Sequence, residues 1–167
     1  MDIHFKEEQR FTQWWLWLIL IPIGILPVVG IIKQLILGED FGDKPMSDFG
    51  LIFFSFFAFS LLGLFLIMRL KTEIDQNEIR MSFIPFVKKR IKWTEIKKAE
   101  VLNYGFVGGW GIRFSSKFGT VYNIKGNKGL AIELRSGKRF VIGTQKETEM
   151  QNVIDQIRQV SPTENER

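Results

Sequence analysis

The sequence predicts a membrane α-helical hairpin followed by an α+β, mainly-β domain that closes with one helix. Three observations lead to this fold class. Two apolar runs without charges, Phe11 to Ile32 and Phe49 to Met68, are each long enough to cross a bilayer as a helix. From Lys71 onward apolar and polar residues alternate, as they do in half-buried strands. A helical period of apolar residues returns only between Met150 and Val160.

Length and composition limit the number of domains and the available chemistry. The 167 residues have room for a tail and hairpin in residues 1–70, one small domain in 71–160 and a frayed tail in 161–167. The chain contains no cysteine, which excludes disulfides, thiolate metal sites and cysteine nucleophiles. Its single histidine, His4, lies in the N-terminal tail, where we expect it to be solvated.

The two apolar runs are predicted to span the membrane at about 11–34 and 49–69. The first run is longer than the apolar core of a signal peptide and no Ala-x-Ala site follows it, so we expect a retained helix. Pro22 and Pro27 remove backbone donors and are expected to bend this helix near its middle. Neither run contains an ionisable residue, which argues against a transporter or a proton relay.

The distribution of charge around the two runs predicts their orientation. The connection from Gly38 to Asp48 carries four acids and one lysine. Cations flank the other ends, with Lys6 and Arg10 before the first run and Arg69 and Lys71 after the second. Since cytoplasmic segments carry the excess of Lys and Arg, we expect a multi-pass protein of the inner cell membrane with both termini in the cytoplasm.

The domain behind the hairpin is predicted as a meander of about seven short antiparallel strands. Period-two runs are separated by turn residues such as Asp75 to Glu78 and Ser136 to Lys138. Thr144 and Glu147 have the spacing of a capping box at the start of the closing helix. Apolar residues on one face of that helix would plug one end of a curved sheet or partly open barrel: Met150, Val153, Ile154, Ile157 and Val160.

Four short segments carry a resemblance to a known family. They are Ile84-Pro85-Phe86, Ile91 to Ile96, Gly108 to Arg113, and Ile142 to Gln145. In these segments the chain resembles bacterial membrane proteins that carry a pleckstrin-homology-like (bacterial PH) domain behind two transmembrane helices. The resemblance spans nearly the whole chain and implies a PH-like fold and a membrane location. That family is largely uncharacterised, so the resemblance implies no catalytic residues and no cofactor.

A run of basic residues at the start of the domain is the first candidate site. Its cations form a candidate lipid or partner surface: Lys88, Lys89, Arg90, Lys92, Lys97 and Lys98. Such a run can lie against anionic headgroups, with about 1 kcal/mol from each cation near the surface, or it can be a solvated strand face. No recognition-helix, RNP-like or zinc signature accompanies it, so no nucleic acid is expected as a partner.

A glycine-rich segment is the second candidate site. The candidate loop consists of Gly108, Gly109, Trp110, Gly111 and Arg113. It lacks the glycine order and the Gly-Lys-Ser/Thr ending of phosphate-cradling loops, and a strand pattern follows it where those motifs require a helix. We therefore expect a tight loop or bulge that connects two strands.

Function is predicted from location, since no constellation of residues specifies a reaction. We expect no enzyme activity, no metal site and no cofactor, because the folded domain offers no Cys or His for nucleophilic or acid–base chemistry. The favoured interpretation is a tethered scaffold that recruits a protein partner, or a second copy of itself, at the cytoplasmic face of the bilayer. The alternatives are an anionic-lipid sensor using residues 88–98, and an accessory subunit of an envelope complex that uses the Phe-rich second span.

Overall fold

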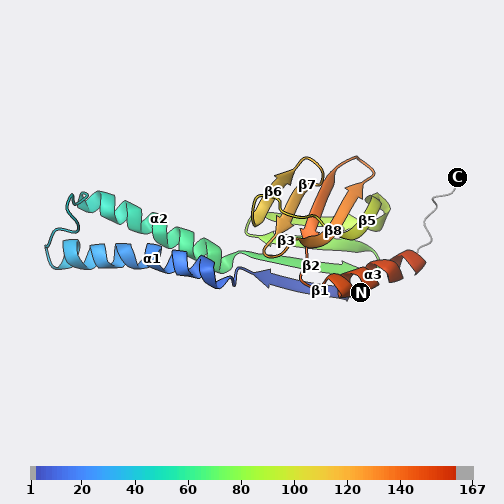
Figure 1. The fold of residues 1–167 in the computed structure, drawn as a ribbon, viewed down its shortest axis with the longest axis horizontal. Coiled ribbons are helices and arrows are strands. Elements are labelled where there is room, and N and C mark those ends of the chain that lie inside the picture. Colours follow the sequence, from blue (N-terminus) through green and yellow to red (C-terminus); the bar gives the residue numbers. More distant parts are fainter. Residues whose placement is uncertain (1–2, 161–167) are drawn as a thin grey trace. The chain divides into compact units, whose positions relative to one another are not determined.

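The computed structural model describes residues 3–160 (Figure 1). The chain divides into two compact units. One unit runs from Phe11 to Met68 and is called the apolar hairpin below. The other, called the sheet domain, combines the strand before the hairpin with the chain from Arg69 onward. The predicted frayed tail, residues 161–167, lies outside the described residues.

The apolar hairpin contains two long helices. Helix α1 (Trp14–Gly30) continues into a π-helical segment, η1 (Ile31–Ile36), and α2 (Asp48–Ile67) returns after a connecting loop. Both are long and apolar enough to cross a membrane, and they agree with the predicted spans to within a few residues. Helix α1 runs through Pro22 and Pro27 before it widens into η1. Helix α2 is capped by Ser47, whose Oγ accepts a hydrogen bond from the Gly50 N–H at 3.2 Å.

The sheet domain begins with a strand that the sequence analysis placed in a solvated tail. Strand β1 (Ile3–Arg10) pairs in antiparallel fashion along β2 (Arg69–Asp75), so residues 3–10 belong to the sheet domain and not, as predicted, to the hairpin region. The strand escaped prediction because two of its inward positions are polar. Phe5 is buried, but so are Glu7 and Gln9, and this removes the apolar alternation that marks a half-buried strand.

Nine strands of the described chain form two sheets, where about seven strands of one meander were predicted. The first sheet has the order β1-β2-β3-β4 and is antiparallel, with β3 at Glu78–Ile84 and β4 at Val87–Lys92. The second has the order β5-β8-β9-β7-β6, with β7 and β9 parallel. Its strands are β5 (Ile96–Asn103), β6 (Gly111–Ser115), β7 (Gly119–Asn123), β8 (Lys128–Leu134) and β9 (Arg139–Gly143).

The core lies between these elements, and the strand pairing of the described residues does not close into a barrel. The first sheet turns Leu70, Ile74, Ile79, Met81 and Phe83 inward, each at most 2% exposed. The second contributes Leu130, Ile132 and Ile142, equally buried, while Val121 and Val141 pack with Tyr104 in a smaller cluster on its other face. Ring contact between Phe83 of β3 and Tyr122 of β7, with centroids 6.5 Å apart, joins the inner faces of the two sheets.

Helix α3 (Glu147–Val160) closes the domain and packs against β5, β1 and β8 (Figure 1). The predicted apolar face is confirmed for the residues whose side chains are described, since Met150, Val153, Ile154 and Ile157 are buried. The predicted capping box is wrong. The Thr144 hydroxyl accepts from the Lys146 N–H at 3.0 Å, while the Glu147 carboxylate pairs with Lys128 and not with the backbone of residue 144.

Candidate binding surfaces of the sheet domain

The predicted basic run is divided between the two sheets. Lys88, Lys89, Arg90 and Lys92 lie on β4, the edge strand of the first sheet. Lys97 and Lys98 lie on β5, an edge of the second sheet. Between the two strands a short 3₁₀ turn, η2 (Trp93–Glu95), carries the chain from one sheet to the other. The six cations therefore do not form one continuous surface.

The two cations on β5 are neutralised by neighbouring acids. Lys97 Nζ lies 2.7 Å from the Glu133 carboxylate, and Lys98 Nζ lies 2.7 Å from that of Glu100. The hydrogen bond from Lys97 lowers the pKa of Glu133 below its ordinary value. Since each lysine has an acid beside it, these two positions offer little uncompensated charge to a ligand.

The cations of β4 alternate between the two faces of the first sheet. Lys88, Arg90 and Lys92 are exposed and stand opposite Ser82, Arg80 and Glu78 of β3. Lys89 stands opposite the buried Met81, so it points to the inner side. Its ammonium lies 4.4 Å from the ring centroid of Phe140 and 5.1 Å from that of Tyr122, within the range of cation–π attraction.

An open groove of about 570 Å³ lies beside β4. Cations from distant parts of the sequence meet there: Lys88, Lys89 and Arg90 from the first sheet, and Lys138 and Arg139 from the start of β9. The sequence analysis identified the turn at Ser136 to Lys138 but not that it faces β4. Whether the turn faces β4 depends on which strands pair over long sequence separations and in which register. No local pattern in the sequence encodes that pairing.

The glycine-rich candidate loop connects β5 to β6, as predicted. Gly105, Gly108, Gly109 and Gly111 all have positive φ, between 71° and 117°, a region that L side chains rarely adopt. Asn123 fixes the loop from β7 by donating to the Gly109 carbonyl at 3.4 Å and to the Tyr104 hydroxyl at 3.1 Å. Burial raises the pKa of that tyrosine.

Aromatic side chains project from this loop and from β6. Phe106 is 87% exposed, Phe114 is 85% exposed and Trp110 is 36% exposed. These three residues are called the aromatic surface below. The sequence analysis selected Trp110 and Arg113, but the two phenylalanines are far more exposed than Trp110. Strand β6, which carries Phe114, ends the second sheet and pairs with β7 alone in the described chain, so its other edge is open.

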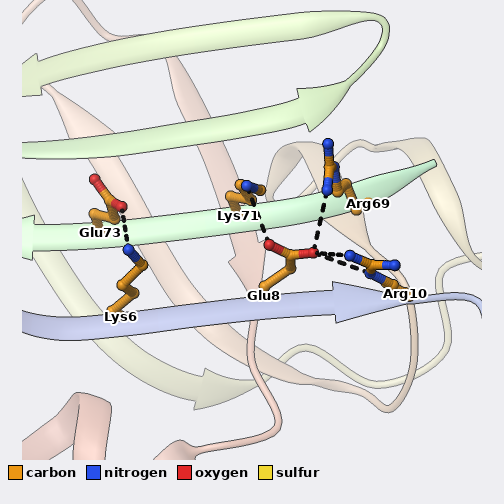
Figure 2. A network of polar contacts seen from close by, with 6 residues as sticks. All are labelled: Lys6, Glu8, Arg10, Arg69, Lys71 and Glu73. Carbon is orange, nitrogen blue, oxygen red and sulfur yellow. Dashed lines mark hydrogen bonds and ion pairs between the residues drawn. The ribbon is translucent and has the colours of Figure 1, made fainter. Parts of the chain in front are cut away.

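A network of charges surrounds Glu8 where β1 ends and β2 begins (Figure 2). Its carboxylate accepts hydrogen bonds from Arg10 at 2.7 and 2.9 Å and lies 3.1 Å from Lys71 and 3.5 Å from Arg69. The hydrogen bonds from Arg10 and then from Lys71 lower the pKa of Glu8 from 4.5 to about 2. Three cations share one acid here, so the network keeps a net positive charge.

A second polar cluster joins β1 to the segment before α3, and it is buried. Glu7 accepts from the Thr144 hydroxyl at 2.6 Å and from the Gln145 N–H at 2.8 Å. Gln9 donates its side-chain amide to the Gly143 carbonyl at 2.8 Å. These bonds explain why polar side chains occupy inward positions of β1, since each meets a partner more than 130 residues away.

The part of the chain that the structure describes contains no group of side chains suited to bind a metal ion. Within residues 3–160 no three His, Asp or Glu side chains lie close enough together to hold a metal ion. Comparison of the chain with protein-family models, with curated proteins and with solved structures finds no match.

Proposed function

We propose that this chain is a membrane-anchored binding module whose PH-like sheet domain recruits a protein partner at the cytoplasmic face of the inner membrane. In this proposal the apolar hairpin crosses the bilayer twice and the aromatic surface contacts the partner. The observation that carries it is the exposure of two phenylalanines, Phe106 in the loop that leads into β6 and Phe114 on β6 itself, whose outer edge is open.

The exposure of apolar side chains supports a membrane location for the hairpin. Only 22% and 17% of the residues in the most apolar windows of its two helices are buried within the chain. Large rings are among the exposed groups, including Phe49 at 79% and Phe56 at 71%. A pair of helices with so much uncovered apolar surface requires lipid or other apolar helices around it.

The connections between hairpin and sheet domain support permanent anchoring. The residues Phe11 to Gln13 join Arg10 to α1, and Met68 alone joins α2 to Arg69. Three residues span at most about 10 Å. Because both connections leave from neighbouring strands, the domain cannot move far from the helix ends, and a partner bound to it is held at the membrane.

Charge supports the cytoplasmic assignment. Cations gather at the strand ends through which the chain leaves and re-enters the sheet domain, with Arg10, Arg69 and Lys71 around the single acid Glu8. The connection between the helices carries four acids and one lysine. The excess of cations on the domain side is the pattern of a cytoplasmic segment.

The form of the aromatic surface supports a protein partner. Aromatic residues are enriched at protein interfaces, and an open strand edge can pair with an extended segment of another chain. Proteins usually protect such edges with charges or coverings. Here β6 carries Arg113 and the exposed Phe114, so one of its two exposed side chains is apolar.

The arrangement of the sheet domain supports the PH-like assignment in part. Mostly antiparallel strands followed by a C-terminal helix are in keeping with the resemblance, although the strands form two sheets. The parallel pairing of β7 with β9 departs from a simple meander. The proposal therefore includes an added β6–β7 hairpin at one edge of the second sheet.

Site-specific photo-crosslinking in intact cells tests partner recruitment. A photoreactive phenylalanine analogue replaces Phe106, Phe114 or, as a control, Phe86, which is 54% exposed but lies between β3 and β4. We expect the same adduct from positions 106 and 114 and none from 86, and Phe114→Ser should abolish the adduct at 106. An adduct of twice the chain's mass would identify the partner as a second copy. No specific adduct from either position contradicts the proposal.

Exchange of the hairpin separates anchoring from a subunit role. If residues 11–68 only tether the domain, an unrelated two-helix membrane hairpin between Arg10 and Arg69 retains the adduct at position 114. Loss of the adduct with normal membrane insertion would instead favour the accessory-subunit alternative, in which the Phe-rich second helix makes the contact.

A further inference from the structure

We propose that the groove between β4 and the start of β9 binds a phosphate-bearing anion. This site goes beyond partner recruitment at the aromatic surface, although Phe114 also lies on its rim. Its two walls come from different sheets, so the sequence alone does not reveal it.

The charge of the groove is the first argument. Five of its lining residues are cations, namely Lys88, Lys89, Arg90, Lys138 and Arg139, and none of its lining residues is an acid. Like charges gathered in a concave site repel one another and raise the local concentration of anions. An anion that enters the groove relieves this repulsion.

The acids near the groove are already engaged with other cations. Glu133 stands opposite Arg139 in the β8–β9 pairing but bonds to Lys97 at 2.7 Å. Arg80 stands opposite Arg90 and forms ion pairs with the neighbouring acids, with Asp75 at 3.1 Å and with Glu73 at 3.5 Å. Lys88, Lys89, Arg90 and Lys138 therefore keep their charge available for a ligand, while Arg139 also lies close enough to Glu133 for its charge to lower the pKa of that acid.

The floor of the groove holds one cation in place. Lys89 is half-buried, with its ammonium 4.4 Å from the centroid of the Phe140 ring. An aromatic face attracts the ammonium without neutralising it. Its three N–H donors can therefore turn toward an anion at a position that the rings fix.

The opposite wall is held by close backbone packing. Gly119 of β7, at φ +73°, lies so close to β9 that a Cβ at this position would overlap the carbonyl oxygen of Arg139. The guanidinium of Arg139 donates to the Ser116 carbonyl at 3.4 Å, which occupies one of its five N–H donors. Strand alternation places the Arg139 side chain on the face of β9 that carries Val141, opposite Glu133, so it adds positive charge beside the groove and does not lie on its floor with Lys89.

The dimensions and donors favour a phosphate group over a longer polyanion. Arginine binds phosphate through paired N–H donors and lysine binds it as a point charge, and the groove contains both. A nucleic acid or an acidic tail would need a strip of cations that continues beyond the groove. That continuation is absent on β5 within the described chain, because Glu133 and Glu100 neutralise Lys97 and Lys98.

Calorimetry on the full chain in phosphatidylcholine nanodiscs tests the site with inorganic pyrophosphate as the probe. The groove variant Lys88→Gln with Arg90→Gln removes two exposed cations from β4. The matched control Lys44→Gln with Lys125→Gln removes two exposed cations that do not line the groove. We expect the groove variant to bind about 25-fold more weakly, since each of the two cations contributes about a factor of five, and the control to bind as the unchanged chain does.

Lys138→Gln removes a cation from the opposite wall of the groove and tests the site independently. It should weaken pyrophosphate binding about fivefold. The same titration in discs with about one-fifth phosphatidylglycerol, at an ionic strength near 0.15 M where charges more than about 8 Å apart are largely screened, distinguishes the source of the phosphate. Loss of pyrophosphate binding there identifies a lipid headgroup as the occupant, and retention identifies a soluble phosphate compound. Absence of binding in phosphatidylcholine discs, or equal weakening in both double variants, overturns the proposal.

Discussion

Arg10 and Arg69 are register partners at the end of the β1–β2 ladder, and both contact the same carboxylate oxygen, Oε1 of Glu8, at 2.7 and 3.5 Å. Like charges directly opposite each other destabilise a strand pair. Glu8 offsets this repulsion at the point where the chain leaves the sheet for the hairpin and returns from it (Figure 2). The position of one acid therefore stabilises both connections of the hairpin.

Replacement of Glu8 should make this stabilisation visible through its pH dependence. The pKa of Glu8 is lowered from 4.5 to about 2, so its contribution is complete above pH 4.5 and is lost as the pH falls toward 2. Because the site is exposed, we expect Glu8→Gln to lower the free energy of unfolding of the sheet domain by only about 1 kcal/mol at pH 7. Thermal unfolding in detergent between pH 7 and pH 2.5 measures the difference.

The control for this experiment is Glu149→Gln, which removes an acid paired with Lys146 on the surface of α3. It should change the free energy of unfolding by less than about 0.5 kcal/mol. A difference between Glu8→Gln and the unchanged chain that grows as the pH falls would contradict the assigned role of Glu8.

Thr144 should be sensitive to loss of its hydroxyl and tolerant of loss of its methyl group. The hydroxyl donates to the buried Glu7 carboxylate at 2.6 Å and accepts from the Lys146 N–H. Thr144→Val leaves that carboxylate without one of its donors and should cost about 2 kcal/mol, whereas Thr144→Ser should cost less than about 1 kcal/mol. Equal losses of thermal stability in the two variants would show that the bond to β1 contributes nothing.

Gly119 and Gly137 provide a matched pair, since both have positive φ, +73° and +82°. A Cβ at Gly119 would overlap the backbone of Arg139, while a Cβ at Gly137 meets nothing within 4 Å. Gly137→Ala should cost about 1 kcal/mol for the backbone conformation alone. Gly119→Ala should cost at least about 2 kcal/mol more, because β7 and β9 must separate. Similar melting temperatures for the two variants would contradict the parallel β7–β9 pairing.

Local patterns in the sequence predicted the elements better than their partners. The apolar runs, the β2–β3 hairpin and the buried face of α3 follow from hydrophobic period, which depends only on near neighbours in the chain. Strand β1 did not follow, because Glu7 and Gln9 stand at inward positions and their hydrogen-bond partners lie at Gly143 to Gln145. A polar residue at an inward position can be recognised only when its distant partner is known.

The candidate sites show the same limit. The sequence shows the six cations as one run. Their division between two sheets depends on two features that the sequence does not display. One is the change of sheet at η2, which separates Lys92 from Lys97. The other is the pairing of β5 with β8, which gives Lys97 an acid in Glu133. Pairing across the sheet determines which cations keep their charge available.

The proposed orientation predicts which parts of the chain a membrane-impermeant thiol reagent reaches. The natural sequence has no cysteine, so single substitutions report without background. In intact cells Asp43→Cys, in the connection between the helices, should be labelled, and Lys125→Cys, between β7 and β8, should be labelled only after the cells are opened. Labelling of Lys125→Cys in intact cells would place the sheet domain outside.

The most direct test of the account is to remove the apolar hairpin and determine where each chain is found. Because Arg10 and Arg69 are register partners, a two-residue Asn-Gly turn in place of residues 11–68 can close β1 onto β2. We predict that the full chain stays in the membrane pellet after alkaline carbonate extraction, while the shortened chain is folded and monodisperse in buffer. Recovery of the full chain as a monodisperse species without detergent, or aggregation of the shortened chain, would contradict a membrane hairpin inserted into a self-sufficient domain.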